Sequence, residues 1–313
     1  MQEKNTPHKL IIIGGGPAGL TASIYASRYK IPHLIISPVF GGAAKEAHQI
    51  ENWPGIKQIK GSELAELMFT HAKSYNPETL EESAKKIEKT DFGFQLSTSG
   101  GKDLNTLSVI FAGGTQHRRL SIPGEQELLG RGVSYCATCD GTFFKDKTIA
   151  VIGGANSAIM AAMELSEHVS KLYLIFRGPE LKGEPIWIDR VKENKKIVLV
   201  PMTNLTRIVG TNKVEKIELD VPFEGNKEII LDGVFIEIGV SPLIDILKNL
   251  SIKLDQIGNI EINSEGKTNI EGLFAAGDAT SGSGGFRQVI TASAEGAISA
   301  KSSFEFLKGK GLL

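Results

Sequence analysis

The sequence contains one local pattern twice, and this internal repeat is the feature that most limits the possible fold. Residues 9–19 read KLIIIGGGPAG and residues 148–158 read TIAVIGGANSA, so that the first glycines of the two turns, Gly14 and Gly153, lie 139 positions apart. Each copy consists of an apolar run, a glycine turn and a segment with apolar residues at helical spacing. This is the order of the first strand, turn and helix of a dinucleotide-binding fold.

The segments that follow the two turns complete the pattern. We predict helices over about 17–29 and 156–169, each followed by another apolar strand, near 34–36 and 172–176. Two βαβ openings in one chain predict an α/β protein with two tandem Rossmann-like three-layer domains. A chain of 313 residues is long enough to form two hydrophobic cores.

Two crossover segments indicate that the second domain is inserted in the first. Residues 113–124 and residues 239–242 are rich in the glycine and proline that mark such connections. A long final helix, over about 285–307, would return the chain to the first domain. We therefore predict a first domain of residues 1–115 and 243–313 and a second domain of residues 116–242.

The first turn matches the GxGxxG pattern. Gly14 turns the chain, Gly16 lets backbone N–H groups approach a pyrophosphate, and Gly19 lets the helix pack closely on the strand. The pattern follows a clear strand and opens a clear helix, and this context makes a dinucleotide site the preferred interpretation. The second strand ends at Ser37, where a carboxylate commonly binds ribose; a hydroxyl binds ribose with less discrimination.

The second turn departs from the pattern at two positions. Ala155 stands at the middle glycine and Ala158 at the third. Alanine is common at the third position, but a methyl group at the second projects to where a pyrophosphate would lie. Two interpretations stay open: a nucleotide site, or a turn that folds in the same way and holds no nucleotide.

The two cysteines of the chain form a single CxxC motif, Cys136 and Cys139. Secreted disulfide frameworks have more cysteines at wider spacing, so the pair indicates thiol–disulfide exchange, in which the second thiol resolves a mixed disulfide. Half of a zinc site is the alternative, but the six histidines show no matching spacing. Asp140 follows directly and is a candidate acid–base for the departing thiolate, or simply a turn residue.

Charge and hydropathy disfavour several other classes of protein. The chain has 35 basic and 36 acidic residues, a formal net charge of −1, which gives no support to nucleic-acid or membrane binding. The first apolar run, residues 10–13, is too short to cross a membrane and lacks a signal-like cleavage site. We expect a cytoplasmic protein with neither nucleic-acid nor membrane partners.

Taken together, the motifs resemble those of the low-molecular-weight thioredoxin reductases over nearly the whole chain. The matching stretches are 14–19 (GGGPAG), 51–55 (ENWPG), 61–64 (GSEL), 122–125 (IPGE), 134–141 (SYCATCDG), 277–278 (GD) and 287–288 (RQ). The resemblance implies an FAD-dependent thioredoxin-disulfide reductase that is a homodimer, binds FAD in its first domain and passes electrons to a thioredoxin-like protein.

The same resemblance implies roles for individual residues. Cys139 would face the flavin, Cys136 would attack the disulfide of the partner, and Asp140 would be the acid–base. The implied cofactor-binding residues are Gly14, Gly16, Pro17, Ala18, Gly19, Ser37, Gly42, Asn52, Gly277, Asp278, Arg287, Gln288 and Val289. Members of the family alternate between two domain orientations, because one CxxC cannot touch a buried flavin and a protein partner at once.

The electron donor is the point at which the sequence departs from the family. Members that use NADPH carry a His-Arg-Arg-x-x-x-Arg run whose guanidinium groups bind the 2′-phosphate. Here residues 176–182 read FRGPELK, and Arg177 alone remains. With Ala155, this predicts an atypical donor, ferredoxin or a deazaflavin, while NAD(P)H stays open. Basic residues between 176 and 196 suit an acidic protein donor, although a solvated helix face also explains them.

Two other functions agree with the same motifs. A flavin-dependent dithiol oxidase that uses oxygen needs no nicotinamide site, and a flavin redox sensor without turnover needs none either. The tandem fold is shared by many chemistries and does not choose among them. Hydrogen peroxide production from dithiols would distinguish the oxidase.

Overall fold

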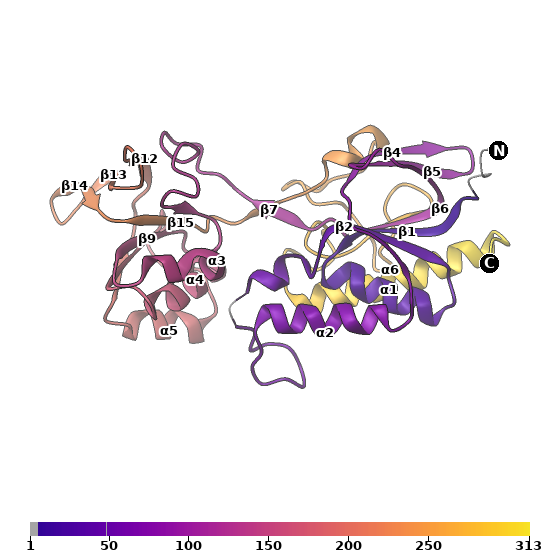
Figure 1. The fold of residues 1–313 in the computed structure, drawn as a ribbon, viewed down its shortest axis with the longest axis horizontal. Coiled ribbons are helices and arrows are strands. Elements are labelled where there is room, and N and C mark those ends of the chain that lie inside the picture. Colours follow the sequence, from indigo (N-terminus) through magenta and orange to yellow (C-terminus); the bar gives the residue numbers. More distant parts are fainter. Residues whose placement is uncertain (1–5, 48) are drawn as a thin grey trace. The chain divides into compact units, whose positions relative to one another are not determined.

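The fold is that of a computed structural model, which describes residues 6–47 and 49–313. The chain divides into two compact units (Figure 1). Unit 1 comprises Met1–Gln116 and Ser241–Leu313, and unit 2 comprises His117–Val240. Unit 2 is thus an insertion in unit 1. No helix among the described residues is long and apolar enough to cross a membrane.

Unit 1 is built on one mixed sheet. Its strands are β1 (His8–Gly15), β2 (His33–Phe40), β3 (Glu78–Leu80), β4 (Ala84–Thr90), β5 (Gly93–Thr98), β6 (Asp103–Phe111) and β17 (Leu273–Ala275). The order is β3-β2-β1-β6-β5-β4, with β17 also paired to β6. Strands β1, β2, β3, β6 and β17 pair in parallel, whereas β4 and β5 form an antiparallel hairpin that continues from β6.

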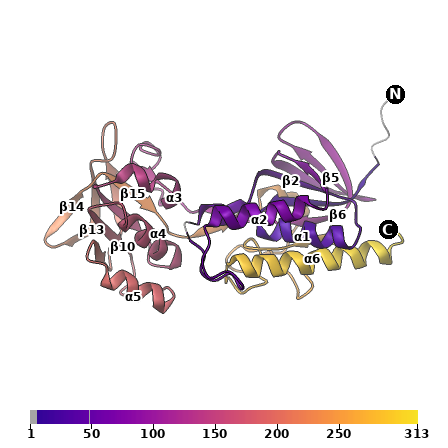
Figure 2. The same cartoon turned by 60° about the horizontal axis from the view of Figure 1, so that its bottom comes forward.

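Three helices cover one face of this sheet. They are α1 (Pro17–Arg28), α2 (Gly61–Lys73) and α6 (Val289–Gly309), and they run side by side (Figures 1 and 2). Two short 3-10 helices, η1 (Gly42–Glu46) and η3 (Asp245–Leu250), complete the unit.

Successive side chains of β1 point to opposite faces of the sheet, and both faces are buried. Leu10 and Ile12 pack on the helix side, in a cluster with Ala22 of α1. Ile11 and Ile13 point to the opposite side and join a cluster that contains Phe94 of the hairpin. Because both faces are buried, the strand reads as a continuous apolar run. The result is the predicted three-layer arrangement.

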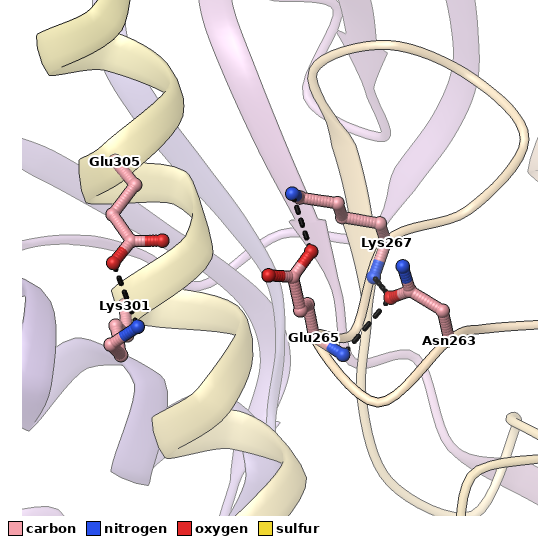
Figure 3. Close-up of polar contacts among 5 residues, drawn as sticks. All are labelled: Asn263, Glu265, Lys267, Lys301 and Glu305. Carbon is pink, nitrogen blue, oxygen red and sulfur yellow. Dashed lines mark hydrogen bonds and ion pairs between the residues drawn. The ribbon is translucent and has the colours of Figure 1, made fainter.

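A loop of unit 1 beside α6 is held by its own polar contacts (Figure 3). The Oδ1 atom of Asn263 accepts hydrogen bonds from the backbone N–H groups of Glu265 and Lys267, each at 3.0 Å. Lys267 also pairs with Glu265 at 2.5 Å, and on the helix Lys301 pairs with Glu305 at 2.7 Å. The asparagine bonds fix the turn, while exposed ion pairs of this kind add little stability.

Unit 2 repeats the three-layer plan. Its strands are β8 (Val133–Ser134), β9 (Thr148–Ile152), β10 (Lys171–Ile175), β11 (Ile197–Val200), β12 (Leu205–Val209), β13 (Lys216–Phe223), β14 (Asn226–Ile230) and β15 (Gly233–Ile236). Its helices are α3 (Ala137–Asp140), η2 (Gly141–Phe144), α4 (Asn156–Ser166) and α5 (Pro185–Glu193). The parallel sheet has the order β11-β10-β9-β15-β8, and β12-β13-β14 form a separate antiparallel sheet.

The core of unit 2 also has two sides. Ile149 and Val151 of β9 pack with Ile159 and other apolar residues of α4. Ala150 and Ile152 pack instead with Ile217 and the rest of the antiparallel sheet. The parallel strands at the centre of each unit's main sheet confirm the predicted α/β class with two Rossmann-like domains.

The two segments that connect the units form short strands, β7 (Thr115–His117) and β16 (Val240–Pro242), which pair with each other. They lie within the predicted crossover segments. The predicted start of the last helix at about 285 is wrong, since α6 begins at Val289. Its N-cap is Gln288, whose backbone N–H donates to Oγ1 of Thr291 at 3.1 Å, and this capping box fixes the first turn.

The close packing of α1 on β1 predicts a large effect of Gly19→Ala. An added Cβ would lie 1.9 Å from the carbonyl oxygen of Gly14, so the helix must move away from the strand. We expect a loss of at least about 3 kcal/mol in the free energy of unfolding, measured by urea denaturation. The control is Gly309→Ala, because no atom lies within 4 Å of the added carbon there. Equal stability of both variants would contradict the packing argument.

Candidate functional site

The first glycine turn is tight because two backbone segments touch where side chains would clash. Gly14 has a φ of +112°, and a Cβ on it would lie 2.1 Å from the carbonyl oxygen of Ala112 on the chain leaving β6. A Cβ on Gly19 would meet the carbonyl of Gly14 itself. These two glycines are therefore required by packing, as the sequence predicted.

Gly16 has a different role, because space remains beside it. The nearest atom to a Cβ on Gly16 is the Cα of Gly42, at an ordinary contact distance of 3.6 Å. Gly16 is also the N-cap of α1 and makes no side-chain capping bond, and Pro17 occupies the first turn. The N-terminal amide groups of this 12-residue helix thus lie next to the backbone of glycines, which carry no side chains. This arrangement suits a negatively charged group such as a pyrophosphate.

Gly42 approaches Gly16 closely through its backbone. Its φ is +56°, and a Cβ on it would come within 2.7 Å of the Cα of Gly16. The structure therefore brings together Gly16, Pro17 and Gly42. The predicted end of the second strand at Ser37 is wrong, because β2 continues to Phe40. Ser37 is buried within β2, and its hydroxyl donates to the carbonyl oxygen of Val39 at 2.7 Å, so the hydroxyl proton is already engaged.

A second group of predicted residues gathers at the N-terminal end of α6. The side-chain amide of Asn52 donates to Oε1 of Gln288 at 2.9 Å, although the two residues are 236 positions apart. Gln288 caps the helix that begins at Val289. Gly277, with a φ of +84°, lies beside α1, since a Cβ on it would be 3.0 Å from the Cβ of Ala18. The two groups of predicted cofactor residues are thus neighbours within unit 1.

Asp278 and Arg287 are joined through the backbone. The Nε of Arg287 donates to the carbonyl oxygen of Asp278 at 3.1 Å, and its Nη2 donates to Oδ1 of Asn259 at 2.9 Å. Burial raises the pKa of the Asp278 carboxyl, and the charge of Arg287 opposes this shift. The guanidinium therefore orients the chain at Asp278 and partly compensates its charge.

Sequence reasoning missed three residues that hold this second group in place. They are Asn259, Thr280 and Glu295. Glu295 is buried in α6, where it stands among small residues in the run ASAEGA. That isolated acid in an apolar helix is a signal that was available; Asn259, which lies in a loop, offered none.

The predicted redox pair lies in unit 2. Cys136 and Cys139 form a disulfide with a Cα–Cα distance of 5.3 Å. Cys136 is the N-cap of α3, and its Sγ accepts a hydrogen bond from the backbone N–H of Cys139 at 3.1 Å. Asp140 is half-buried at the end of α3, and its backbone N–H donates to the carbonyl oxygen of Cys136 at 3.3 Å. A reduced Cys136 would meet the same amide, which favours a thiolate.

Two acidic residues that the sequence did not single out lie close to this pair. The hydroxyl of Thr138, inside the motif, donates to Glu164 of α4 at 3.1 Å. Glu125 is buried, and its carboxylate accepts hydrogen bonds from the backbone N–H groups of Leu120 and Ser121 and from the hydroxyl of Tyr135, at 2.5–2.8 Å. Burial, and then the Glu125 carboxylate, raise the pKa of Tyr135 well above its usual value. Glu125 thus anchors the residue that precedes Cys136.

The second glycine turn has the Rossmann shape with a methyl group at its centre. Gly153 has a φ of +140°, and a Cβ there would lie 2.1 Å from the carbonyl oxygen of Glu237. Ala155 is the N-cap of α4. The loop that follows β10 is tied to this turn: the backbone N–H of Lys182 donates to the carbonyl of Gly154 at 2.7 Å. The fold of the turn is therefore retained without the middle glycine.

Thioredoxin reductases are among the known proteins that are similar to this chain in sequence and fold. The sequence profile of the family described as pyridine nucleotide-disulphide oxidoreductase matches residues 8–296. The thioredoxin reductase of Bacillus subtilis (strain 168) is 38% identical over 298 residues, 94% of this chain and 93% of the relative.

Solved structures give the same result. The thioredoxin reductase of Lactococcus lactis, in its FR conformation, has a TM-score of 0.92 at 33% identity and covers 96% of this chain and 99% of its own. A ferredoxin-flavin thioredoxin reductase from Clostridium acetobutylicum has a TM-score of 0.54 at 31% identity, with coverage of 98% and 100%.

Two Rossmann-like units with a CxxC disulfide in the inserted one define an oxidoreductase that acts on disulfides. The chain belongs to the pyridine nucleotide-disulphide oxidoreductase family, and the resemblance to thioredoxin reductases inferred from its motifs is confirmed.

The anchor at Glu125 predicts that Glu125→Ala destabilises unit 2. The change leaves buried N–H groups without an acceptor, and we expect a loss of roughly 2–4 kcal/mol in the free energy of unfolding by urea denaturation. Glu228→Ala, which removes an exposed partner of Lys216, is the control and should cost about 1 kcal/mol or less. If both variants lose the same amount, the buried carboxylate does not have the structural role assigned to it.

Proposed function

We propose that the chain is an FAD-dependent thioredoxin-disulfide reductase whose physiological electron donor differs from the usual NADPH. In this proposal electrons pass from FAD to the Cys136–Cys139 pair and then to a thioredoxin-like protein. The active form is a homodimer, as the resemblance implies. The single observation that carries the proposal is the disulfide between these two cysteines, in a chain of this family.

The two cysteines exchange a disulfide with the partner in two steps. The thiolate of reduced Cys136 attacks one sulfur of the partner's disulfide, which releases the other partner sulfur as a thiolate and forms a mixed disulfide. The thiolate of Cys139 then attacks Cys136, reforms the internal disulfide and releases the second partner thiol. Two electrons and two protons reach the partner. Asp140 is assigned the proton transfer, because it ends the helix that carries both sulfurs.

The residues of unit 1 suit a bound FAD. Gly14, Gly16 and Gly19 would place the amide end of α1 against its pyrophosphate, since no side chain stands at the N-cap Gly16 to keep such a group away. Gly42 and Ser37 border the same end of the sheet. Asn52 and Gln288, with Asp278 and Arg287, would line the remainder of the cofactor. Bound FAD supplies the electron pair that reduces the Cys136–Cys139 disulfide.

The proposal of an atypical donor rests on the second glycine turn and the loop after β10. A methyl group at Ala155 stands where a nicotinamide dinucleotide would approach, and only Arg177 remains of the expected guanidinium groups. A chain 31% identical to this one bears the name ferredoxin-flavin thioredoxin reductase. Ferredoxin, or a reduced deazaflavin, is therefore the donor that we assign.

Cysteine substitutions separate the two half-reactions. In Cys136→Ser, reduction of the flavin by its donor should remain while thioredoxin reduction falls at least about a hundredfold, because the nucleophile is lost. Cys139→Ser should retain the first attack and accumulate a mixed disulfide with thioredoxin, visible on a non-reducing gel. Ser170→Ala, an exposed change elsewhere in unit 2, is the control. Full turnover by Cys136→Ser would refute the assigned roles.

The donor can be identified by anaerobic reduction of the FAD-loaded protein. Reduced ferredoxin or reduced deazaflavin should bleach the flavin absorbance within seconds at micromolar concentration, whereas NADPH and NADH should act far more slowly. Rapid bleaching by micromolar NADPH would contradict an atypical donor. Hydrogen peroxide formed from dithiols and oxygen, without thioredoxin reduction, would favour the dithiol oxidase instead.

A gain-of-function variant sharpens the donor test. Ala155→Gly combined with Gly178→Arg restores the middle glycine and one guanidinium. An added Cβ at Gly178 meets its nearest neighbour, the carbonyl oxygen of Glu180, at 3.4 Å and so fits. The double variant should be reduced by NADPH at least about tenfold faster than the parent; an unchanged rate would mean that these two positions do not limit the donor.

A further inference from the structure

Glu295 is an unusual residue for its position. It lies in the middle of α6 with 9% of its surface exposed, and among the described residues of unit 1 it is the one Asp or Glu that is buried. A carboxylate removed from water is costly unless hydrogen bonds replace its hydration. The contacts of Glu295 therefore need a structural or functional reason.

These contacts all lead to one turn of the chain. Oε2 of Glu295 accepts a hydrogen bond from the backbone N–H of Gly277 at 2.8 Å and another from the hydroxyl of Thr280 at 2.7 Å. A Cβ on Gly282 would lie 2.8 Å from Oε1, so the chain also passes close to the second oxygen. The turn after β17 is thus wrapped around this carboxylate.

The turn needs an acceptor at this point. Gly277 has a φ of +84°, and the strand β17 has already ended at Ala275, so that the N–H of Gly277 has left the sheet. The carbonyl of Gly277 closes the turn by accepting from the N–H of Thr280 at 2.9 Å. Glu295 binds both ends of this closed turn. It lies in α6, 18 residues after Gly277 and 15 residues after Thr280.

Asp278 lies inside the turn that Glu295 holds. Its carbonyl is fixed from one side by Arg287, while the N–H of the preceding residue is fixed from the other side by Glu295. We propose that Glu295 is a positioning residue of the cofactor site, which sets the Gly277–Thr280 turn so that Asp278 faces FAD. This inference rests on the proposed binding of FAD in unit 1.

The hydrogen bonds, rather than the negative charge, carry this role. The bonds from Gly277 and Thr280 both end on Oε2, and the Ser283 side chain also bonds the carboxylate. Glutamine keeps an oxygen that can accept the bonds from Gly277 and Thr280. Burial raises the pKa of Glu295, the bonds from Thr280 and Gly277 oppose this shift, and the nearby Asp278 adds to it. A second negative charge beside Asp278 gives no advantage for an anionic cofactor, so the amide should replace the acid without loss.

The test is FAD affinity of the deflavinated full chain, measured by the quenching of flavin fluorescence on titration. Glu295→Ala should raise the Kd for FAD at least about tenfold, and Thr280→Val, which removes one of the two bonds, about threefold. Glu295→Gln should match the parent within about 1.5-fold, a smaller change than that expected for Thr280→Val. The control is Glu305→Ala on the same helix, whose exposed carboxylate pairs with Lys301 (Figure 3) and should leave the Kd unchanged.

The outcomes separate this inference from the proposed function. Parent-like FAD affinity in Glu295→Ala would overturn it, and so would a loss in Glu295→Gln as large as that in Glu295→Ala, since charge would then be the cause. If Glu295→Ala does not fold by circular dichroism, Thr280→Val decides, and parent-like affinity there overturns the inference. A parent protein that binds no FAD would instead overturn the proposed function, and this inference with it.

Discussion

The contact between the first helix and the first strand of unit 1 is the constraint on which the candidate cofactor site depends. α1 can lie against β1 only because Gly14 and Gly19 carry no side chain, and the same approach leaves the helix amides open beside Gly16. The same two glycines therefore set the turn, the helix packing and the candidate cofactor site. The turn at Gly277 packs against Ala18 at the same end of α1. The position of the residues around Gly277 therefore depends on the position of α1.

Unit 2 has the same arrangement of strand, glycine turn and helix, but its turn differs at the middle glycine position. Its glycine turn keeps the residue that geometry demands, Gly153, where any side chain would collide with Glu237. At the middle position of the turn it has Ala155 instead of glycine, and the packing there allows a methyl group. The fold itself requires glycine at the first position of the turn, Gly153. A bound nucleotide would require it at the middle position, residue 155. A Rossmann turn can therefore keep its fold with alanine in place of the middle glycine.

Much of the fold could be predicted because its signals are local. The apolar runs and glycine turns at 14 and 153 predicted two Rossmann-like domains, and each unit has a sheet with a parallel core that begins with such a strand and turn. The start of α6 lies later than predicted because Gly284 and Gly285 have positive φ and cannot belong to the helix, and the capping box at Gln288 and Thr291 decides the boundary. The CxxC was visible in the sequence, and the disulfide agrees with it. Contacts such as Asn52 with Gln288, or Glu295 with Gly277, join residues that no sequence periodicity relates.

The pairing of β7 with β16 has a consequence for how such proteins arise. Because these two strands are hydrogen-bonded neighbours, the inserted unit begins and ends at almost one point. Such a unit can be exchanged for another as a cassette, with the host sheet unchanged on either side of the graft. A change of partner or reductant can therefore be confined to the cassette, while the host unit that receives it keeps its sequence.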